Sequence, residues 1–135
     1  MSVMVKKMKM VHEQDPREYI LEQLAGEQDK IDLFGARVLV ATYIRPERTV
    51  GGIILTDGVR KEDVFQGRVG LVLKLGPAAF KDTKDVQFYG KTLNVGDWAY
   101  YRPSDGVGIA VNGVMCRVIE DVMIDGTTED VDVVL

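Results

Sequence analysis

Short runs of apolar residues, separated by turns that contain glycine, make up most of the chain from Phe34 onward. Many short strands at near-regular spacing, with no helical pattern between them, are typical of a small antiparallel barrel. We therefore predict an all-β domain, a small antiparallel β-barrel. Its strands are expected at residues 37–41, 69–75, 98–101, 107–111 and 114–119.

The turns between these runs support the same interpretation. Gly76-Pro77 ends the second run, and Asp105-Gly106 precedes the fourth. Asn112-Gly113 joins the last two runs and predicts a two-residue hairpin, because a type I′ turn needs positive φ at both central residues. Residues 131–135 also have strand composition, but no neighbouring run is an evident partner for them.

A short amphipathic helix is predicted ahead of the strands. Asp15 is a good N-cap, Pro16 suits the first helical position, and Gly26 gives a stop. So short a helix is marginal alone in water, and we expect it to pack on the domain or on a neighbouring subunit. Three apolar residues are expected to share its buried face: Tyr19, Ile20 and Leu24.

The chain divides into three parts on this pattern. Residues 1–32 form an N-terminal extension with the helix, residues 33–125 the barrel domain, and residues 126–135 a C-terminal tail or strand. Methionines and lysines alternate at the very start, without the apolar run of a signal peptide. This predicts a loose or partner-bound arm.

The segment at residues 50–56 combines two glycines with a bulky apolar triplet. The conformational entropy of Gly51 and Gly52 disfavours a rigid strand. Each of the three following side chains would gain roughly 1.5–3 kcal/mol from full burial. A flexible segment of this kind suits a loop that orders on contact with a partner. The alternative is a short core strand between two turns. The triplet is Ile53, Ile54 and Leu55.

Composition and charge limit the classes of function. The 135 residues, 46% of them hydrophobic, are enough for one compact domain without metals or disulfides. No apolar run approaches the roughly 20 residues that cross a bilayer. The net charge of −4 argues against nucleic acid as a partner. Cys116 is the only cysteine, which excludes an internal disulfide and suits a reducing, cytoplasmic compartment.

No set of residues indicates catalysis or a cofactor. His12 is the only histidine and lies far in sequence from Cys116, which we place in the core or at an interface. Asp97 and Asp105 have the context of turn residues. An aromatic cluster could stack on bases in an OB-like barrel, but one basic neighbour is too little, and a core or interface role is favoured. The cluster is Trp98, Tyr100 and Tyr101.

Four segments, in their order along the chain, carry a resemblance to a known family: residues 37–40, residues 51–56, residues 67–77, and residues 95–97 together with 105–106 and 118–122. They resemble parts of the GroES-like co-chaperonins, the chaperonin-10 family. In the same order, these parts are the family's first barrel strand, its glycine-glycine-aliphatic mobile loop, the strand and turn after that loop, and the C-terminal half.

The resemblance implies a ring, heptameric in the family, that caps a GroEL-like chaperonin in its ATP-bound state. The cap encloses unfolded client proteins and needs no catalytic residue or cofactor of its own. The mobile loop would lie at about residues 46–66. Its chaperonin-binding residues would be Gly51, Gly52, Ile53, Ile54, Leu55 and Thr56.

A roof over the folding chamber is also implied, by a hairpin at about residues 78–92. Phe88, Tyr89 and Val107 would line it. An ordinary surface excursion, with its aromatics folded back on the barrel, is the alternative. Val107 replaces the aromatic residue that bacterial members often have between two glycines. This departure and the N-terminal extension are similar to the divergence of bacteriophage-encoded members, whose place would be the host cytoplasm.

A second hypothesis is a structural ring-forming barrel, such as a virion or scaffold component, without chaperonin binding. The loop at residues 51–56 discriminates between the two. A purely structural barrel has no need to present an apolar triplet on a flexible segment.

Overall fold

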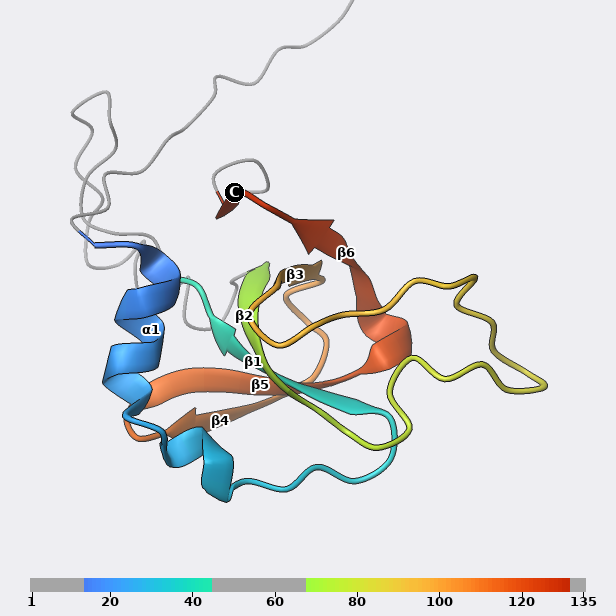
Figure 1. Cartoon of the computed structure of the whole chain (residues 1–135), viewed down its shortest axis with the longest axis horizontal. Helices are drawn as coiled ribbons and strands as arrows, with labels where there is room; N and C mark the ends of the chain where they lie inside the picture. The colour runs from blue at the N-terminus through green and yellow to red at the C-terminus, as the bar shows by residue number, and fades with distance from the viewer. Residues whose placement is uncertain (1–13, 45–67, 132–135) are drawn as a thin grey trace, which may run out of the picture.

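A computed structural model of the chain describes residues 14–44 and 68–131, which form one antiparallel β-sheet with a short helix beside it (Figure 1). The sheet is strongly twisted, and the helix packs at one end of it. The elements are α1 (Pro16–Leu24), the 3-10 helix η1 (Glu27–Lys30), β1 (Arg37–Thr42), β2 (Val69–Leu75), β3 (Trp98–Tyr101), β4 (Val107–Val111), β5 (Val114–Glu120), the 3-10 helix η2 (Asp121–Met123) and β6 (Ile124–Thr128).

The six strands pair in the order β4-β5-β1-β2-β3-β6, and every neighbouring pair is antiparallel. The predicted fold class is confirmed: the described part of the chain is mostly β with one short α-helix, consistent with a small GroES-like β fold. The five strands expected from the apolar runs are all present, with ends within one residue of those predicted.

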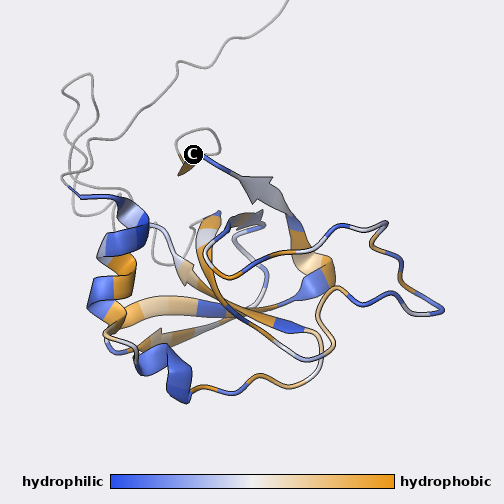
Figure 2. Cartoon of the chain, viewed as in Figure 1, coloured by the Kyte–Doolittle hydropathy of each residue, from blue (hydrophilic) through white to orange (hydrophobic). Residues whose placement is uncertain are grey.

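β1 is buried on both of its faces, which explains its continuous apolar sequence. Leu39 and Ala41 belong to one core cluster, whereas Val38 and Val40 belong to another. Successive side chains of a strand point to opposite sides, so the two clusters lie on opposite faces of the sheet at this strand. Figure 2 shows hydrophobic residues along β2 and much of β5, the two neighbours of β1.

We call these clusters the helix-side core and the second core. The helix-side core contains residues of α1 and of five strands, together with residues that flank them. Its members are Ile20, Leu24, Leu33, Leu39, Ala41, Tyr43, Val69, Leu71, Leu73, Trp98, Val111, Cys116 and Val131. The second core consists of Val38, Val40, Val72, Leu93, Ala99, Tyr101 and Ile119.

α1 begins and ends as the sequence predicts, with one correction. The Asp15 carboxylate accepts hydrogen bonds from the backbone N–H groups of Arg17 and Glu18, at 2.8 and 3.3 Å. Ala25 adopts the left-handed conformation at the C-terminus, and Gly26 follows in the same region. Tyr19 was predicted on the buried face, but its side chain is 53% exposed. The buried residues, Ile20 and Leu24, lie four positions apart and define the packed face, and Tyr19 is about 100° away from Ile20 around the helix.

The turn between β4 and β5 connects the helix to the sheet. Asn112 and Gly113 both have positive φ, 48° and 80°, as the predicted type I′ turn requires. The Asn112 side-chain amide donates hydrogen bonds to the carbonyls of Gln23 and Leu24, at 3.0 and 3.3 Å. These carbonyls belong to the last turn of α1, which has no partners within the helix for them.

β6 is the one strand that the apolar pattern did not predict. Its sequence, Ile-Asp-Gly-Thr-Thr, contains Asp125 and Gly126, two residue types depleted in strands, yet it pairs with β3. Gly126 lies opposite Tyr100, and a Cβ atom there would be 2.3 Å from the tyrosine hydroxyl oxygen. Val131, beyond this strand, is buried in the helix-side core, whereas residues 132–135 of the predicted C-terminal strand lie outside the described residues.

No helix among the described residues is both long and apolar enough to span a membrane.

Candidate functional site

The six predicted chaperonin-binding residues lie outside the described part of the chain, so their role stays a prediction. They fall between β1 and β2, in the segment 45–67. The structure does describe the residues on either side of this segment. We call these residues the loop base: Tyr43, Ile44, Arg68 and Val69.

The loop base is held together by the sheet. The backbone N–H of Tyr43 donates a 2.9 Å hydrogen bond to the carbonyl of Val69. The Arg68 carbonyl accepts a 2.9 Å bond from the N–H of Tyr101, in the neighbouring strand β3. The chain therefore leaves and re-enters the sheet at one fixed point between two adjacent antiparallel strands.

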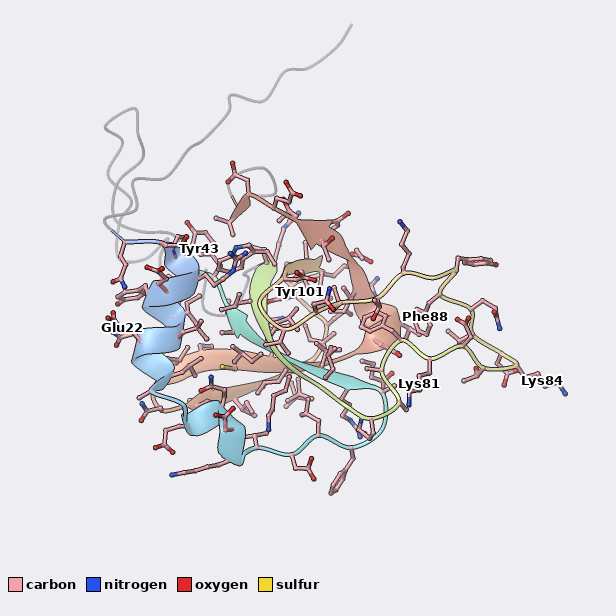
Figure 3. The ribbon with its side chains drawn as sticks, in the orientation of Figure 1. Glu22, Tyr43, Lys81, Lys84, Phe88 and Tyr101 are labelled. Carbon is pink, nitrogen blue, oxygen red and sulfur yellow. The ribbon has the colours of Figure 1, made fainter. Side chains whose placement is uncertain are left out.

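Tyr43 anchors the loop base in the helix-side core. Its side chain is 4% exposed and meets the Trp98 ring edge to face, with 5.9 Å between centroids and 75° between planes. The Arg17 guanidinium of α1 lies 5.7 Å from the centroid of the same indole ring. Figure 3 shows Tyr43 beside the N-terminal half of α1. Tyr43, two positions before the segment 45–67, is thus held by the sheet and lies in the core that α1 helps to form.

A long loop at residues 78–92, the predicted roof, extends away from the sheet (Figure 1). It forms no β-strand, and its shape depends on local hydrogen bonds. The Thr83 N–H donates to the Val86 carbonyl at 2.8 Å, and the Phe88 N–H donates to the Asp82 carboxylate at 2.8 Å. Lys84 lies at the outer end of the loop in Figure 3.

The base of this loop is fixed by Phe80 and Asp121. Phe80 packs against the second core and meets Phe88 edge to face, with 5.2 Å between ring centroids. Its backbone N–H donates a 3.0 Å hydrogen bond to the carboxylate of Asp121, which is buried. The second oxygen of that carboxylate accepts from the N–H of Val122 at 2.7 Å. Each oxygen of this buried side chain therefore has a backbone hydrogen-bond partner, as a buried polar group requires.

The three predicted roof residues have different environments. Phe88 is half-buried against Phe80, whereas Tyr89 is 88% exposed. Val107 lies on another element, at the start of the edge strand β4, and is 68% exposed. Phe80 and Phe88 are folded back on the sheet, whereas Tyr89 is exposed. The loop therefore combines features of a roof and of an ordinary surface excursion. Its role as a roof stays a prediction.

The residues considered for catalysis have structural surroundings. Cys116 is fully buried, and burial raises the pKa of its thiol to about 11, so the thiol is protonated at neutral pH. The Asp97 carboxylate accepts a 2.8 Å hydrogen bond from the Asn94 N–H, and Asp105 forms an ion pair with Arg102 at 3.0 Å. Both aspartates are turn residues, as predicted. His12 lies outside the described residues.

The aromatic cluster belongs to the core, as predicted. Trp98 and Tyr101 are buried, and Tyr100 is half-buried. Burial raises the pKa of Tyr101 to about 12. Within residues 14–44 and 68–131, no group of three or more His, Cys, Asp or Glu side chains is placed to hold a metal ion.

The link from α1 to the loop base was missed by sequence reasoning. Arg17 contacts Trp98 across more than 80 positions of the chain, and no local pattern marks such a pair. The single indication was Asp15-Pro16, which predicted the helix but not the surface on which it packs.

Comparison with known proteins identifies the family. A family model described as the chaperonin 10 Kd subunit matches residues 30–127, well over half of the chain. This range includes β1 to β5, β6 except for Thr128, the segment 45–67 and the loop at 78–92, but not α1. The chain matches no curated protein individually. From the family match we conclude that the chain belongs to the chaperonin 10 kDa subunit family, whose members are non-enzymatic co-chaperonins.

Proposed function

We propose that this protein forms a ring-shaped lid on a GroEL-like chaperonin, and that the ring has seven subunits, as in the GroES-like family. Membership of the family implies a co-chaperonin function in general, with an oligomeric ring and a GroEL-type partner. The finer proposal is that the lid closes the folding chamber when the chaperonin has bound ATP, and leaves when the nucleotide state changes. The observation that carries it is the family match across residues 30–127.

The proposed contact is made by Gly51, Gly52, Ile53, Ile54, Leu55 and Thr56. Burial of the three apolar side chains contributes roughly 1.5–3 kcal/mol each, whereas ordering the backbone costs roughly 1–2 kcal/mol per residue. These terms nearly cancel, so one segment binds weakly. Several segments on one ring bind tightly, because each further contact forms at high effective concentration.

The loop base supports this arrangement. The Tyr43–Val69 hydrogen bond joins the residues that flank the segment 45–67. Under this proposal, each subunit therefore presents the segment from one point. Ring geometry then fixes the spacing between the presentation points. Multivalent binding requires this, since the advantage is lost when the sites cannot be engaged together.

We further propose that the loop at 78–92 roofs the enclosed chamber, with Phe88, Tyr89 and Val107 toward its interior. Exposure of Tyr89 and Val107 and the firm attachment of the loop through Phe80 and Asp121 support this role. Client proteins would be enclosed in the chamber rather than bound by the lid. The proposed location is the cytoplasm, that of the host if the chain is phage-encoded, without a nucleic-acid or membrane partner.

The decisive experiment is ATP-dependent co-sedimentation with a GroEL-type double ring, using Ile54→Ser and the matched control Val107→Ser. Both changes replace an apolar side chain with serine. We expect both variants to assemble as the unmodified protein does, and only Ile54→Ser to lose chaperonin binding. Removing the roughly 1.5–3 kcal/mol of one buried side chain from every subunit weakens the multivalent contact severely.

Two results would contradict the proposal. If Ile54→Ser failed to fold or assemble, the triplet would belong to the core of the domain. If the unmodified ring did not associate with the chaperonin at micromolar concentration with ATP, the protein would instead be a structural ring.

A further inference from the structure

α1 lies outside the range that matches the family, yet it completes the core beneath the loop base. The family match begins at residue 30, whereas the helix spans Pro16–Leu24. Its two buried residues, Ile20 and Leu24, belong to the helix-side core, as do Tyr43 and Val69 of the loop base. α1 therefore shares one core with the loop base, next to the proposed chaperonin-binding segment in the chain.

Trp98 connects the helix to the loop base directly. The Arg17 guanidinium lies over its indole ring at 5.7 Å, and the Tyr43 ring meets the indole edge to face at 5.9 Å. A cation–π contact contributes roughly 0.5–2 kcal/mol, more where it is shielded from water. Trp98 is 4% exposed, and the Nε atom of Arg17 is buried. The contact is therefore of the shielded kind.

The opposite end of α1 is also fixed to the sheet. The Asn112 amide of the β4–β5 turn bonds the carbonyls of Gln23 and Leu24. A nine-residue helix is marginal by itself, so these contacts at its two ends and the burial of Ile20 and Leu24 determine its position. Both ends of the helix are therefore attached to the sheet, and its buried residues share the helix-side core with Trp98 and Tyr43.

We propose that α1 is a positioning element for the chaperonin-binding segment, with Arg17 acting through Trp98 on Tyr43. This inference rests on the proposed function. With α1 in place, Tyr43 is ordered before the chaperonin arrives. Without it, Tyr43 and Ile44 are less firmly held and must be ordered during docking, and this added entropic cost lowers the affinity.

The size of the effect follows from the ordering cost. One additional residue to order, at roughly 1–2 kcal/mol, corresponds to about tenfold weaker binding of a single segment. Several segments act together in a ring, so the loss in ring affinity is larger than tenfold. The ring itself is expected to assemble normally.

A direct contact between α1 and the chaperonin would give a different pattern of variants. Tyr19 and Leu21 are the large apolar residues on the outward side of the helix, 53% and 42% exposed. A surface contact would depend on these residues. The positioning role depends on Arg17, and it does not depend on Tyr19.

The test uses Arg17→Ala, the conservative variant Arg17→Lys and the control Tyr19→Ala in the full-length chain. Three quantities are measured: affinity for a GroEL-type chaperonin with ATP, amide hydrogen exchange at Tyr43 and Val40, and fluorescence of Trp98, the only tryptophan. The Tyr43 amide bonds Val69 at the loop base, whereas Val40 lies in the centre of the sheet. A general loss of stability would accelerate exchange at both positions.

We expect Arg17→Ala to shift the Trp98 emission, accelerate exchange at Tyr43 but not at Val40, and weaken chaperonin binding at least tenfold. Arg17→Lys should recover most of the affinity, because it keeps a cation near the ring, and Tyr19→Ala should match the unmodified protein. Unchanged affinity or unchanged Tyr43 exchange in Arg17→Ala would overturn the proposal, as would equal acceleration at Val40 or an equal loss of binding in Tyr19→Ala. If the unmodified protein does not bind, the proposed function fails and this inference with it. If it binds but Arg17→Ala is indistinguishable, only the inference fails.

Discussion

Gly76 packs against the backbone of residues 35–37 so closely that even a methyl group does not fit. A Cβ atom on Gly76 would lie 2.4 Å from the Gly35 carbonyl oxygen and 2.9 Å from that of Arg37. Both contacts are with backbone, which cannot rotate aside as a side chain can. Two hydrogen bonds join the same two segments: the N–H of Gly76 donates to the Arg37 carbonyl at 2.7 Å, and the N–H of Ala78 donates to the Gly35 carbonyl at 3.0 Å.

The Gly76→Ala substitution must therefore move residue 76 away from the backbone of residues 35–37. Overpacking by one methyl group typically costs about 1–3 kcal/mol, and each weakened hydrogen bond adds about 0.5–1.5 kcal/mol. We expect the free energy of unfolding to fall by about 2–6 kcal/mol. With a urea m-value of about 2 kcal/mol/M, the unfolding midpoint should move down by about 1–3 M.

Gly108→Ala is the matched control. It adds the same methyl group, but the nearest atom, the Met115 sulfur, is 3.8 Å from the new Cβ, and φ is not positive. The loss of backbone freedom in the unfolded chain stabilises such a variant by about 0.4–1 kcal/mol. Urea unfolding of both variants should be measured at one protomer concentration, because assembly makes apparent stability depend on concentration. Midpoints within about 0.3 M of each other would refute the argument that the 35–37 backbone is rigid.

Three further changes test other parts of the structure. Asn112→Gly keeps the positive φ but removes both hydrogen bonds to α1, and should lower the free energy of unfolding by about 1–2 kcal/mol in urea titrations. Leu24→Ala removes a fully buried side chain and should cost about 2–5 kcal/mol in the same assay; a loss below 1 kcal/mol would mean that the helix is not packed as described. Cys116 and Tyr101 have folded-state pKa values of about 11 and about 12, above their ordinary values of 9.0 and 10.0, so their contribution to stability is complete below pH 9 and is lost as pH rises from 9 to 12. Unfolding midpoints that stay constant over this range, or alkylation of Cys116 at neutral pH without unfolding, would contradict the buried environments.

The strands that could be predicted from the sequence are those whose own residues carry the signal. β1 and β2 are continuous apolar runs because they are buried on both faces. The Asn112-Gly113 turn was predictable because its backbone conformation restricts the residue types that can form it. In these cases local composition and tertiary packing favour the same structure.

The features that escaped prediction depend on residues far away in sequence. Residues 126–135 were predicted as a C-terminal tail or strand without a named partner, and only the structure shows that Gly126 makes room for the Tyr100 ring on β3. Tyr19 is apolar enough for a buried face, and only the packing of Ile20 and Leu24 decides that it faces outward. In the candidate site, the segment at 51–56 was predicted from composition and stays a prediction. Its attachment through Tyr43, Trp98 and Arg17 became visible only in three dimensions.

The strands on either side of the segment 45–67 determine how well the segment could serve as a binding element. It connects β1 and β2, and β1 lies at the centre of the sheet with every residue from Val38 to Thr42 buried. In the proposed function, a weakly binding segment closes the chamber only if the strands on either side of it stay folded. Partial unfolding of the loop base would otherwise offset the small free energy of each contact. Central strands open at nearly the global free energy of unfolding, whereas edge strands such as β4 open more readily. If the segment binds as proposed, its attachment between β1 and β2, beside the buried Tyr43, means that a contact of a few kcal/mol acts on the whole subunit rather than on a local part of it.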